Sequence, residues 1–139
     1  MKKYMIKKTK GKGNGLFASK GIKKGELIFS VDLSKQKVYT AKEIRDNPKL
    51  QSDHCDYIGK GKYIISFHPY SYMNHSCNPT VFVKGKGRKR SYYTLKNIKK
   101  GEELTYDYGA ASSKQEKWIM KCKCGSKNCR KIIRAGYSS

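Results

Sequence analysis

The stretch YSYMNHSCNPT, residues 70–80, brings several chemically useful side chains together. Asn74, His75 and Ser76 supply an amide, an imidazole and a hydroxyl just before an Asn-Pro turn. A turn with satisfied polar groups explains the Asn-Pro pair but not the whole cluster. A serine or cysteine nucleophile paired with His75 is a weaker alternative, because neighbours in sequence rarely point at each other and no further base completes a triad. The stretch therefore indicates a functional site whose chemistry depends on the rest of the chain.

A second stretch, GEELTYDYG at residues 101–109, places two tyrosines two positions apart. On a strand, Tyr106 and Tyr108 share one face and Asp107 lies on the other. Taken alone, the pattern is better explained by two half-buried aromatic residues of an ordinary sheet.

A glycine loop, GKGNG at residues 11–15, precedes both motifs. Glycine has no Cβ and tolerates positive φ, so such a loop lets backbone N–H groups approach a ligand closely. The loop lacks the residue order of a dinucleotide or phosphate loop. Taken alone, the loop is therefore better explained as a plain turn.

Near the end of the chain, KCKCGSKNCRK at residues 121–131 sets Cys122, Cys124 and Cys129 in C-x-C-x4-C spacing. Clustered cysteines in a reducing compartment favour metal ligation over disulfides. A structural zinc ion takes four ligands, so this triplet leaves one ligand to be found elsewhere.

Composition predicts one folded, strongly basic domain. The 139 residues are 37% hydrophobic, which exceeds what a disordered chain carries, and the net charge is +22. No apolar run reaches transmembrane length or follows the charged N-terminus as in a signal peptide, so we expect an intracellular protein without a membrane partner.

The positive charge has two interpretations that remain open. No acidic residue lies between Lys84 and Lys100. The stretch is either a solvated lysine-rich surface or a patch that meets nucleic acid. For the second case we expect the contacts to come from Lys86, Arg88, Lys89 and Arg90.

Local patterns predict a mainly β architecture of many short strands with few helices. Strands are expected within residues 15–31, 62–67, 80–85 and 91–98, which are rich in β-branched and aromatic residues between glycine turns. A short helix is expected at 40–50, where Thr40 caps it, Glu43 completes a capping box and Pro48 ends it. Residues 114–121 predict a second short helix. No β-α-β alternation supports a parallel nucleotide-binding sheet.

The order of these motifs resembles that of the SET-domain protein lysine methyltransferases over nearly the whole chain. The resemblance implies a SET fold of several small sheets, with a knot-like crossing near the active site at Asn74 and His75. It divides the chain into a SET domain at 1–111 and a zinc-binding post-SET tail at 112–139. The chain departs from the family pattern at Asn14, Ser71 and Thr80.

The same resemblance implies roles for individual residues. Tyr108 corresponds to the catalytic tyrosine, and Tyr106 to a position where the family has Tyr or Phe, with Tyr favouring monomethylation. Contacts to the cofactor S-adenosylmethionine map onto five residues: Gly13, Asn14, Gly15, Asn74 and His75. In family members with a zinc-binding tail, the cysteine of N-H-S-C, here Cys77, joins Cys122, Cys124 and Cys129 around one structural zinc ion, and Cys55 lies outside that set.

The function implied is transfer of a methyl group from S-adenosylmethionine to a lysine of a protein substrate. The region between Phe29 and Tyr63, which in the family helps to select substrate, is short, so we expect the enzyme to read the whole shape or charge of its target. Because substrate lysines usually lie in basic tails, we expect a basic chromatin or ribosomal protein as the target, in the cytoplasm or on chromatin. Two alternatives remain open: a basic zinc-bearing nucleic-acid-binding module, and an inactive SET-like scaffold that only binds partners.

Overall fold

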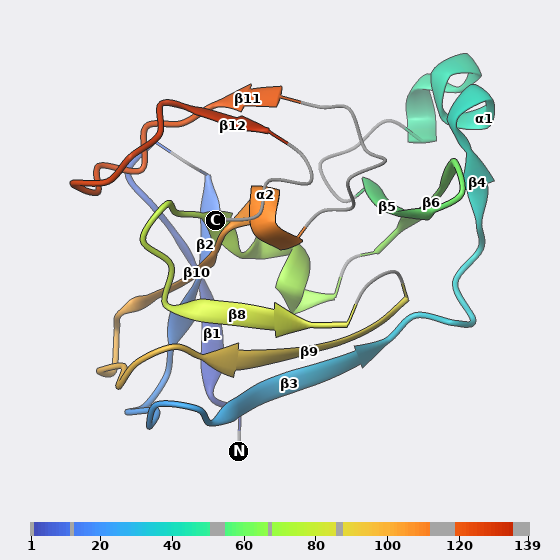
Figure 1. Ribbon diagram of the computed structural model, residues 1–139. Helices are drawn as coiled ribbons and strands as arrows, with labels where there is room; N and C mark the ends of the chain where they lie inside the picture. The colour runs from blue at the N-terminus through green and yellow to red at the C-terminus, as the bar shows by residue number, and fades with distance from the viewer. Residues whose placement is uncertain are drawn as a thin grey trace.

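Strands dominate the fold and helices are few and short, which confirms the mainly β expectation. The computed structural model describes residues 2–11, 13–50, 55–66, 68–85, 88–111 and 119–134. Within these ranges the strands form four small sheets (Figure 1). No helix in the described ranges is both long and apolar enough to cross a membrane.

One four-stranded sheet brings the two motifs of the sequence together. Its strands, in spatial order, are β1 (Tyr4–Lys8), β2 (Asn14–Ala18), β10 (Glu103–Tyr106) and β7 (Asn74–His75). β10 runs antiparallel to β2 but parallel to β7, so that Thr105 faces Asn74 and Tyr106 faces His75. The NHSC and YDY motifs, distant in sequence, therefore lie side by side. The knot-like crossing expected here stays a prediction.

A three-stranded antiparallel sheet forms another layer. Its strands are β3 (Leu27–Asp32), β9 (Lys89–Thr94) and β8 (Val81–Lys84), in that spatial order. Side chains of β9 alternate between the faces, because Tyr92 and Thr94 are 0% and 1% exposed whereas Tyr93 is only partly buried. The inner face joins the main core, which also contains Leu16 and Leu104. The expected strands in 15–31, 80–85 and 91–98 are thus confirmed, the last ending at Thr94.

A third sheet is formed by β4 (Tyr39–Thr40), β6 (Lys62–Ile65) and β5 (Cys55–Gly59), with β6 in the centre. The helix α1 (Ala41–Asp46) follows β4. Thr40 Oγ1 accepts the N–H of Glu43 at 3.1 Å, and Glu43 Oε1 accepts the N–H of Thr40 at 3.1 Å. The predicted capping box is therefore confirmed, and Pro48 begins the 3₁₀ helix η1 (Pro48–Leu50) just past the end of α1.

The C-terminal part forms a hairpin of β11 (Ile119–Lys121) and β12 (Ile132–Arg134), which Figure 1 places at the opposite end of the molecule from β3. The expected helix at 114–121 is wrong for Ile119–Lys121, and residues 114–118 lie outside the described ranges. Ile119 and Met120 pair with Arg134 and Ile133 instead, because pairing with a distant strand outweighs a weak local helix preference.

Candidate active site and metal centre

Tyr108 is held at its backbone and at its hydroxyl by residues at the start of the NHSC segment, His75 and the preceding Met73. The 3₁₀ helix η2 (Pro69–Tyr72) leads into Met73, whose carbonyl accepts the Tyr108 hydroxyl at 2.5 Å. The backbone N–H of Tyr108 donates to Nδ1 of His75 at 3.0 Å. Burial, and secondly the charge of Glu103, raise the pKa of Tyr108 to about 12. The phenol is therefore neutral, and because its proton is engaged by Met73, the oxygen can act toward another group only as an acceptor.

The two tyrosines meet, but not by the predicted geometry. β10 ends at Tyr106, and Tyr108 begins the single-turn helix α2 (Tyr108–Ala111), so the expectation that both lie on one strand face is wrong. A glycine follows Tyr108, and Oδ1 of Asp107 accepts the N–H groups of Gly109 and Ala110, which turns the chain into α2. The rings of Tyr106 and Tyr108 still lie with centroids 4.8 Å apart and planes at 48°.

Tyr106 lies between the core and a cavity. Its ring meets that of Tyr92 edge-on at a centroid distance of 6.1 Å. A cavity of about 530 Å³ opens beside it, between β8, α2 and the loop that follows Cys124. Its lining is mainly apolar along β8 and polar on the side of the cysteine loop, where Asn128 and Arg130 contribute. The space is large enough for a long side chain or a small ligand.

The glycine loop and Asn74 lie against each other, as two of the predicted cofactor segments require. Nδ2 of Asn74 donates to the carbonyl of Asn14 at 3.3 Å and to Oε2 of Glu103 at 2.9 Å. A Cβ on Gly15 would lie 2.8 Å from Oε2 of Glu103 and 3.0 Å from Nδ2 of Asn74. Gly13 has a φ of +70°, a conformation that other residues adopt only with strain. Gly13 and Asn14 are exposed whereas Gly15 is buried against Asn74, so the loop backbone is held close to the Asn74 side chain.

The imidazole of His75 is buried and faces inward. Nδ1 accepts the N–H of Tyr108, and Nε2 lies 3.4 Å from Sγ of Cys77. A contact of His75 with a ligand in the glycine-loop region would therefore come from its backbone, while its side chain positions Tyr108.

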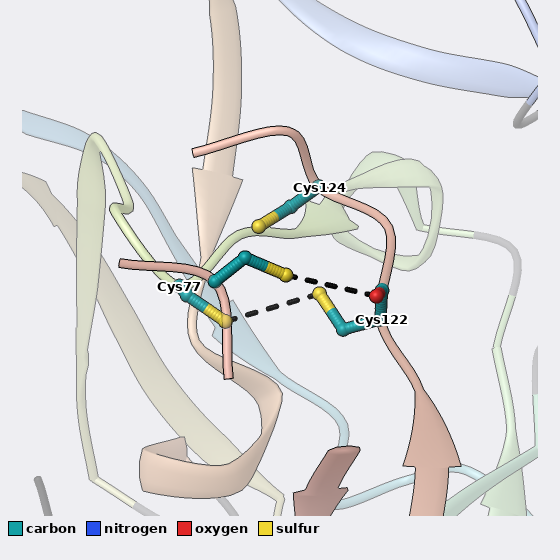
Figure 2. Close-up of side chains that lie close together, drawn as sticks. Cys77, Cys122 and Cys124 are labelled. Atoms are coloured by element: carbon teal, nitrogen blue, oxygen red, sulfur yellow. Dashed lines mark hydrogen bonds between the residues drawn. The ribbon is translucent and has the colours of Figure 1, made fainter. Parts of the chain in front are cut away.

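Four cysteines converge although only three are close in sequence. Ligand sulfurs of Cys77, Cys122, Cys124 and Cys129 all lie within 4.8 Å of one another. Sγ of Cys77 is 3.8 Å from Sγ of Cys122, far beyond disulfide length and close to the sulfur–sulfur edge of about 3.8 Å in a tetrahedron with 2.3 Å metal–sulfur bonds. Figure 2 shows the labelled side chains of Cys77, Cys122 and Cys124 gathered around one point. Cys55 is not among the four.

Thiol acidity varies widely inside the cluster. Burial raises the pKa of Cys122 to about 12. Burial also acts to raise the pKa of Cys124, but hydrogen bonds from Ser126 and from the backbone outweigh it and hold the value at about 5. Four sulfur donors at this spacing suit a tetrahedral zinc ion with no open position, so a metal bound here would be structural.

The cysteine loop is tied to the tyrosine site by polar contacts. The backbone N–H of Arg130 donates to Sγ of Cys77 at 3.4 Å, and Asn128 Nδ2 donates to the Cys77 carbonyl at 2.9 Å. The guanidinium of Arg130 donates to Oδ1 of Asp107 at 2.8 Å. Sequence reasoning missed the parts played by Arg130, Asp107 and Glu103. An Arg directly after the third cysteine and an acid between the two tyrosines were visible, but their pairing depends on the fold.

The comparisons agree with this geometry. The family model described as "SET domain" matches residues 13–109. The chain is 27% identical to the histone-lysine N-methyltransferase Su(var)3-9 of Drosophila melanogaster, over 93% of this chain and 24% of that protein. It is 31% identical to the variant-silencing SET domain-containing protein of Plasmodium falciparum, over 100% of this chain and 6% of that protein. The chain thus spans a quarter or less of the length of these relatives.

The fold has a solved counterpart in the methyltransferase domain of the human histone-lysine N-methyltransferase SETMAR, with a TM-score of 0.67 and 21% identity, covering 95% of this chain and 58% of that one. This likeness supports the arrangement of small sheets seen in Figure 1. Because the family match covers well over half of the residues, the chain belongs to the SET domain family.

Proposed function

We propose that the chain is a protein-lysine N-methyltransferase that uses S-adenosylmethionine. The observation that carries the proposal is the pair of contacts that Tyr108 makes with Met73 and His75, which fix a neutral phenol next to the Tyr106 ring. Membership of the SET family and the histone-lysine N-methyltransferases among the relatives support the same reaction class.

The residues of this chain would act mainly by positioning. When bound, S-adenosylmethionine supplies a methyl group on a cationic sulfonium. The Tyr108 oxygen accepts contacts from the incoming amine and holds it in line for displacement. A free lysine amine has a pKa of about 10.4. Desolvation in the largely apolar cavity and the positive charge of the sulfonium would both lower that pKa, so the neutral nucleophile would be favoured on entry.

Tyr106 would limit the product to monomethyl lysine. Its ring is fixed between Tyr92 and Tyr108 at centroid distances of 6.1 Å and 4.8 Å. The hydroxyl therefore takes up space that an amine carrying a second methyl group needs. The cavity of about 530 Å³ beside Tyr106 supports entry of a substrate side chain from that side.

Cofactor binding would rest on main-chain groups of Gly13, Asn14 and Gly15 together with Asn74 and the backbone of His75. The hydrogen bonds of Asn74 to Asn14 and Glu103 support this assignment, because they hold the two segments at a fixed separation.

The tail would be a zinc-binding post-SET segment. In this division residues 1–111 form the SET domain and residues 112–139 the tail, with Cys77 as the ligand from the SET domain and Cys122, Cys124 and Cys129 from the tail. The spacing of the four sulfurs supports the ligand set. Zinc at this point would pin the β11–β12 hairpin against the active site.

The substrate class we propose is a basic protein of chromatin or of the ribosome, and chromatin is the favoured location because the relatives carry histone-lysine names. A chain with a net charge of +22 repels a basic substrate. An anionic nucleic acid that binds both proteins would remove that repulsion.

The test uses the zinc-loaded chain in two steps. Calorimetry first measures binding of S-adenosylmethionine, and labelled methyl transfer to core histones and to ribosomal proteins is then read by mass spectrometry. We expect stoichiometric cofactor binding and label on lysine. Absence of cofactor binding would favour a zinc-bearing nucleic-acid-binding module, and binding without transfer would favour an inactive scaffold.

A further inference from the structure

The outer face of the β3–β9–β8 sheet carries a row of large apolar side chains. Phe82 of β8 pairs with Tyr93 of β9, which in turn pairs with Leu27 of β3. Phe82 and Tyr93 point away from the core side, because their strand neighbours Val81 and Tyr92 are buried. Leu27 pairs with Tyr93 just before a bulge in β3, and Phe82 also lines the cavity beside Tyr106. Leu27 is 39% exposed. Phe82 and Tyr93 are only partly exposed, and together with Leu27 they form a continuous apolar strip across the sheet.

The two rings in this strip are arranged as a stack. Phe82 and Tyr93 have centroids 5.5 Å apart and planes only 21° from parallel. Nζ of Lys84 lies 5.7 Å from the Tyr93 centroid, within the range of a cation–π contact. The strip therefore combines two partly exposed aromatic rings with an adjacent positive charge.

Basic and small polar residues continue the face beyond the strip. The next row pairs Lys84 with Ser91 and Ser91 with Ser30, whose hydroxyl oxygens lie 3.0 Å apart. Exposed Lys89 follows, opposite Asp32. Among the residues of β3, β8 and β9, Asp32 is the one acid, and its carboxylate already accepts the N–H of Ser34. The flanking charge is thus strongly positive.

Two of the four basic residues expected at this surface are exposed where they were expected. Arg88 and Lys89 are exposed. Arg90 is turned to the inner face, where its guanidinium lies 4.5 Å from the centroid of the Tyr70 ring, so its expected surface role is wrong. The alternation of β9 explains this, because Arg90 shares a face with buried Tyr92. Lys86 lies outside the described residues.

We propose that this face, defined by Phe82, Tyr93 and Leu27 with Lys84 and Lys89, binds single-stranded nucleic acid. Unpaired bases can stack on the accessible parts of the Phe82 and Tyr93 rings, and the phosphates that join the bases can meet the flanking lysines. In a duplex the base faces are stacked inside the helix, so duplex nucleic acid would bind only through the attraction between its phosphates and the lysines. The matched pattern of flat apolar surface and positive charge is what favours a single strand. This binding does not depend on methyl transfer.

The test measures fluorescence anisotropy of labelled 20-nucleotide single strands, as RNA and as DNA, and of the matching DNA duplex with the full zinc-loaded chain. We expect a single strand of either type to bind at least about tenfold more tightly than the duplex. The ratio of the dissociation constants for RNA and DNA single strands then shows which of the two nucleic acids the face prefers. Equal or tighter binding of the duplex, no binding at low salt, or better competition by an acidic tryptophan-containing peptide would overturn the proposal.

Variants separate stacking from charge. Tyr93→Leu keeps an apolar side chain but removes the ring, and we expect it to weaken single-strand binding about tenfold while leaving the duplex unaffected. Lys84→Gln should weaken both and lower the salt slope by about 0.7 for the single strand. Lys49→Gln, the same charge change at an exposed site in η1, is the matched control. Thermal unfolding checks each fold, and a Tyr93→Leu chain that is folded and binds like the parent refutes the stacking face.

Discussion

The guanidinium of Arg130 donates a 2.8 Å hydrogen bond to Oδ1 of Asp107. One contact thereby joins the residue after Cys129 to the residue before Tyr108. Both side chains are largely buried, at 20% and 11% exposed, and the bond to Asp107 raises the pKa of Arg130 above its ordinary value. The same carboxylate oxygen accepts the N–H groups of Gly109 and Ala110 in α2. Asp107 therefore hydrogen-bonds both to the loop that carries the tail cysteines and to the helix that begins at Tyr108.

Removing this ion pair should cost stability and turnover together. We expect Arg130→Met to lower the free energy of unfolding by about 2 kcal/mol, because it leaves the Asp107 carboxylate without its charged partner. Asp107→Asn keeps an acceptor for α2 but removes the charge. A double-mutant cycle from urea unfolding of the zinc-loaded chain should give a coupling of at least about 1 kcal/mol. Strictly additive effects would contradict a direct link.

Loss of the Tyr108 hydroxyl should cut turnover and spare cofactor binding. Tyr108→Phe keeps the ring but removes the acceptor oxygen that Met73 and His75 position, so we expect methyl transfer to fall about 100-fold. Calorimetry should find the affinity for S-adenosylmethionine nearly unchanged. Tyr93→Phe, which removes a hydroxyl on the outer sheet, is the matched control for turnover on a free peptide.

The pH dependence gives a second check on Tyr108. Its pKa is raised to about 12, above the ordinary value near 10, so the phenol stays protonated at working pH. A group raised in this way favours the folded state below pH 10, and that contribution is lost as the pH rises toward 12. The Tyr108→Phe variant should therefore show the same shape of pH–rate profile between pH 7 and 9, only lower. An inflection present in the parent and missing in the variant would contradict a neutral phenol.

Tyr106→Phe should change the product rather than the rate. Removing the hydroxyl opens space beside the amine without disturbing the ring contacts to Tyr92 and Tyr108, so we expect dimethyl lysine to appear where the parent yields monomethyl lysine. Mass spectrometry of the modified peptide at long incubation measures the ratio. A product that remains wholly monomethylated speaks against Tyr106 as the residue that sets the degree of methylation.

Local patterns predicted local structure well. The Thr40 cap with Glu43 at the third helical position forms as expected, since both partners lie within one turn. The strands on either side of the glycine turns were found because β-branched and aromatic residues cluster there. The helix predicted through Ile119 failed because its strand partner, Ile132–Arg134, lies beyond the cysteine loop and exerts no influence that a local pattern can reveal.

The site was predictable in its residues but not in its contacts. Tyr106 and Tyr108 were named, yet their closeness arises from a turn into α2 that Asp107 stabilises, not from a shared strand face. The roles of Glu103 and Arg130 stayed hidden, because each depends on a partner brought close only by folding: Asn74 in one case and Asp107 in the other.

One zinc ion should bind per chain, and Cys77 should matter as much as a tail cysteine. Zinc taken up by thiolates contributes folding energy on the order of 10 kcal/mol in small peptides, so loss of one ligand should release the tail. We expect Cys77→Ser and Cys124→Ser to lower zinc content and activity to a similar extent. Cys55→Ser, outside the cluster, should change neither. Metal analysis that finds full zinc in Cys77→Ser identifies a different fourth ligand.

Gly15→Ala should weaken cofactor binding by disturbing Asn74. An added Cβ would lie 2.8 Å from Oε2 of Glu103, 2.8 Å from Cγ2 of Thr9 and 3.0 Å from Nδ2 of Asn74, closer than side chains tolerate, so the hydrogen bond between Glu103 and Asn74 must shift. Overpacking of this kind typically costs about 1–3 kcal/mol of stability. We expect the affinity for S-adenosylmethionine, measured by calorimetry, to fall at least about tenfold, since Asn74 would no longer be held against the loop. Gly21→Ala is the matched control, because its new Cβ would meet only the Ile98 carbonyl at 3.8 Å. Equal affinities of the two variants would show that Asn74 does not position the cofactor.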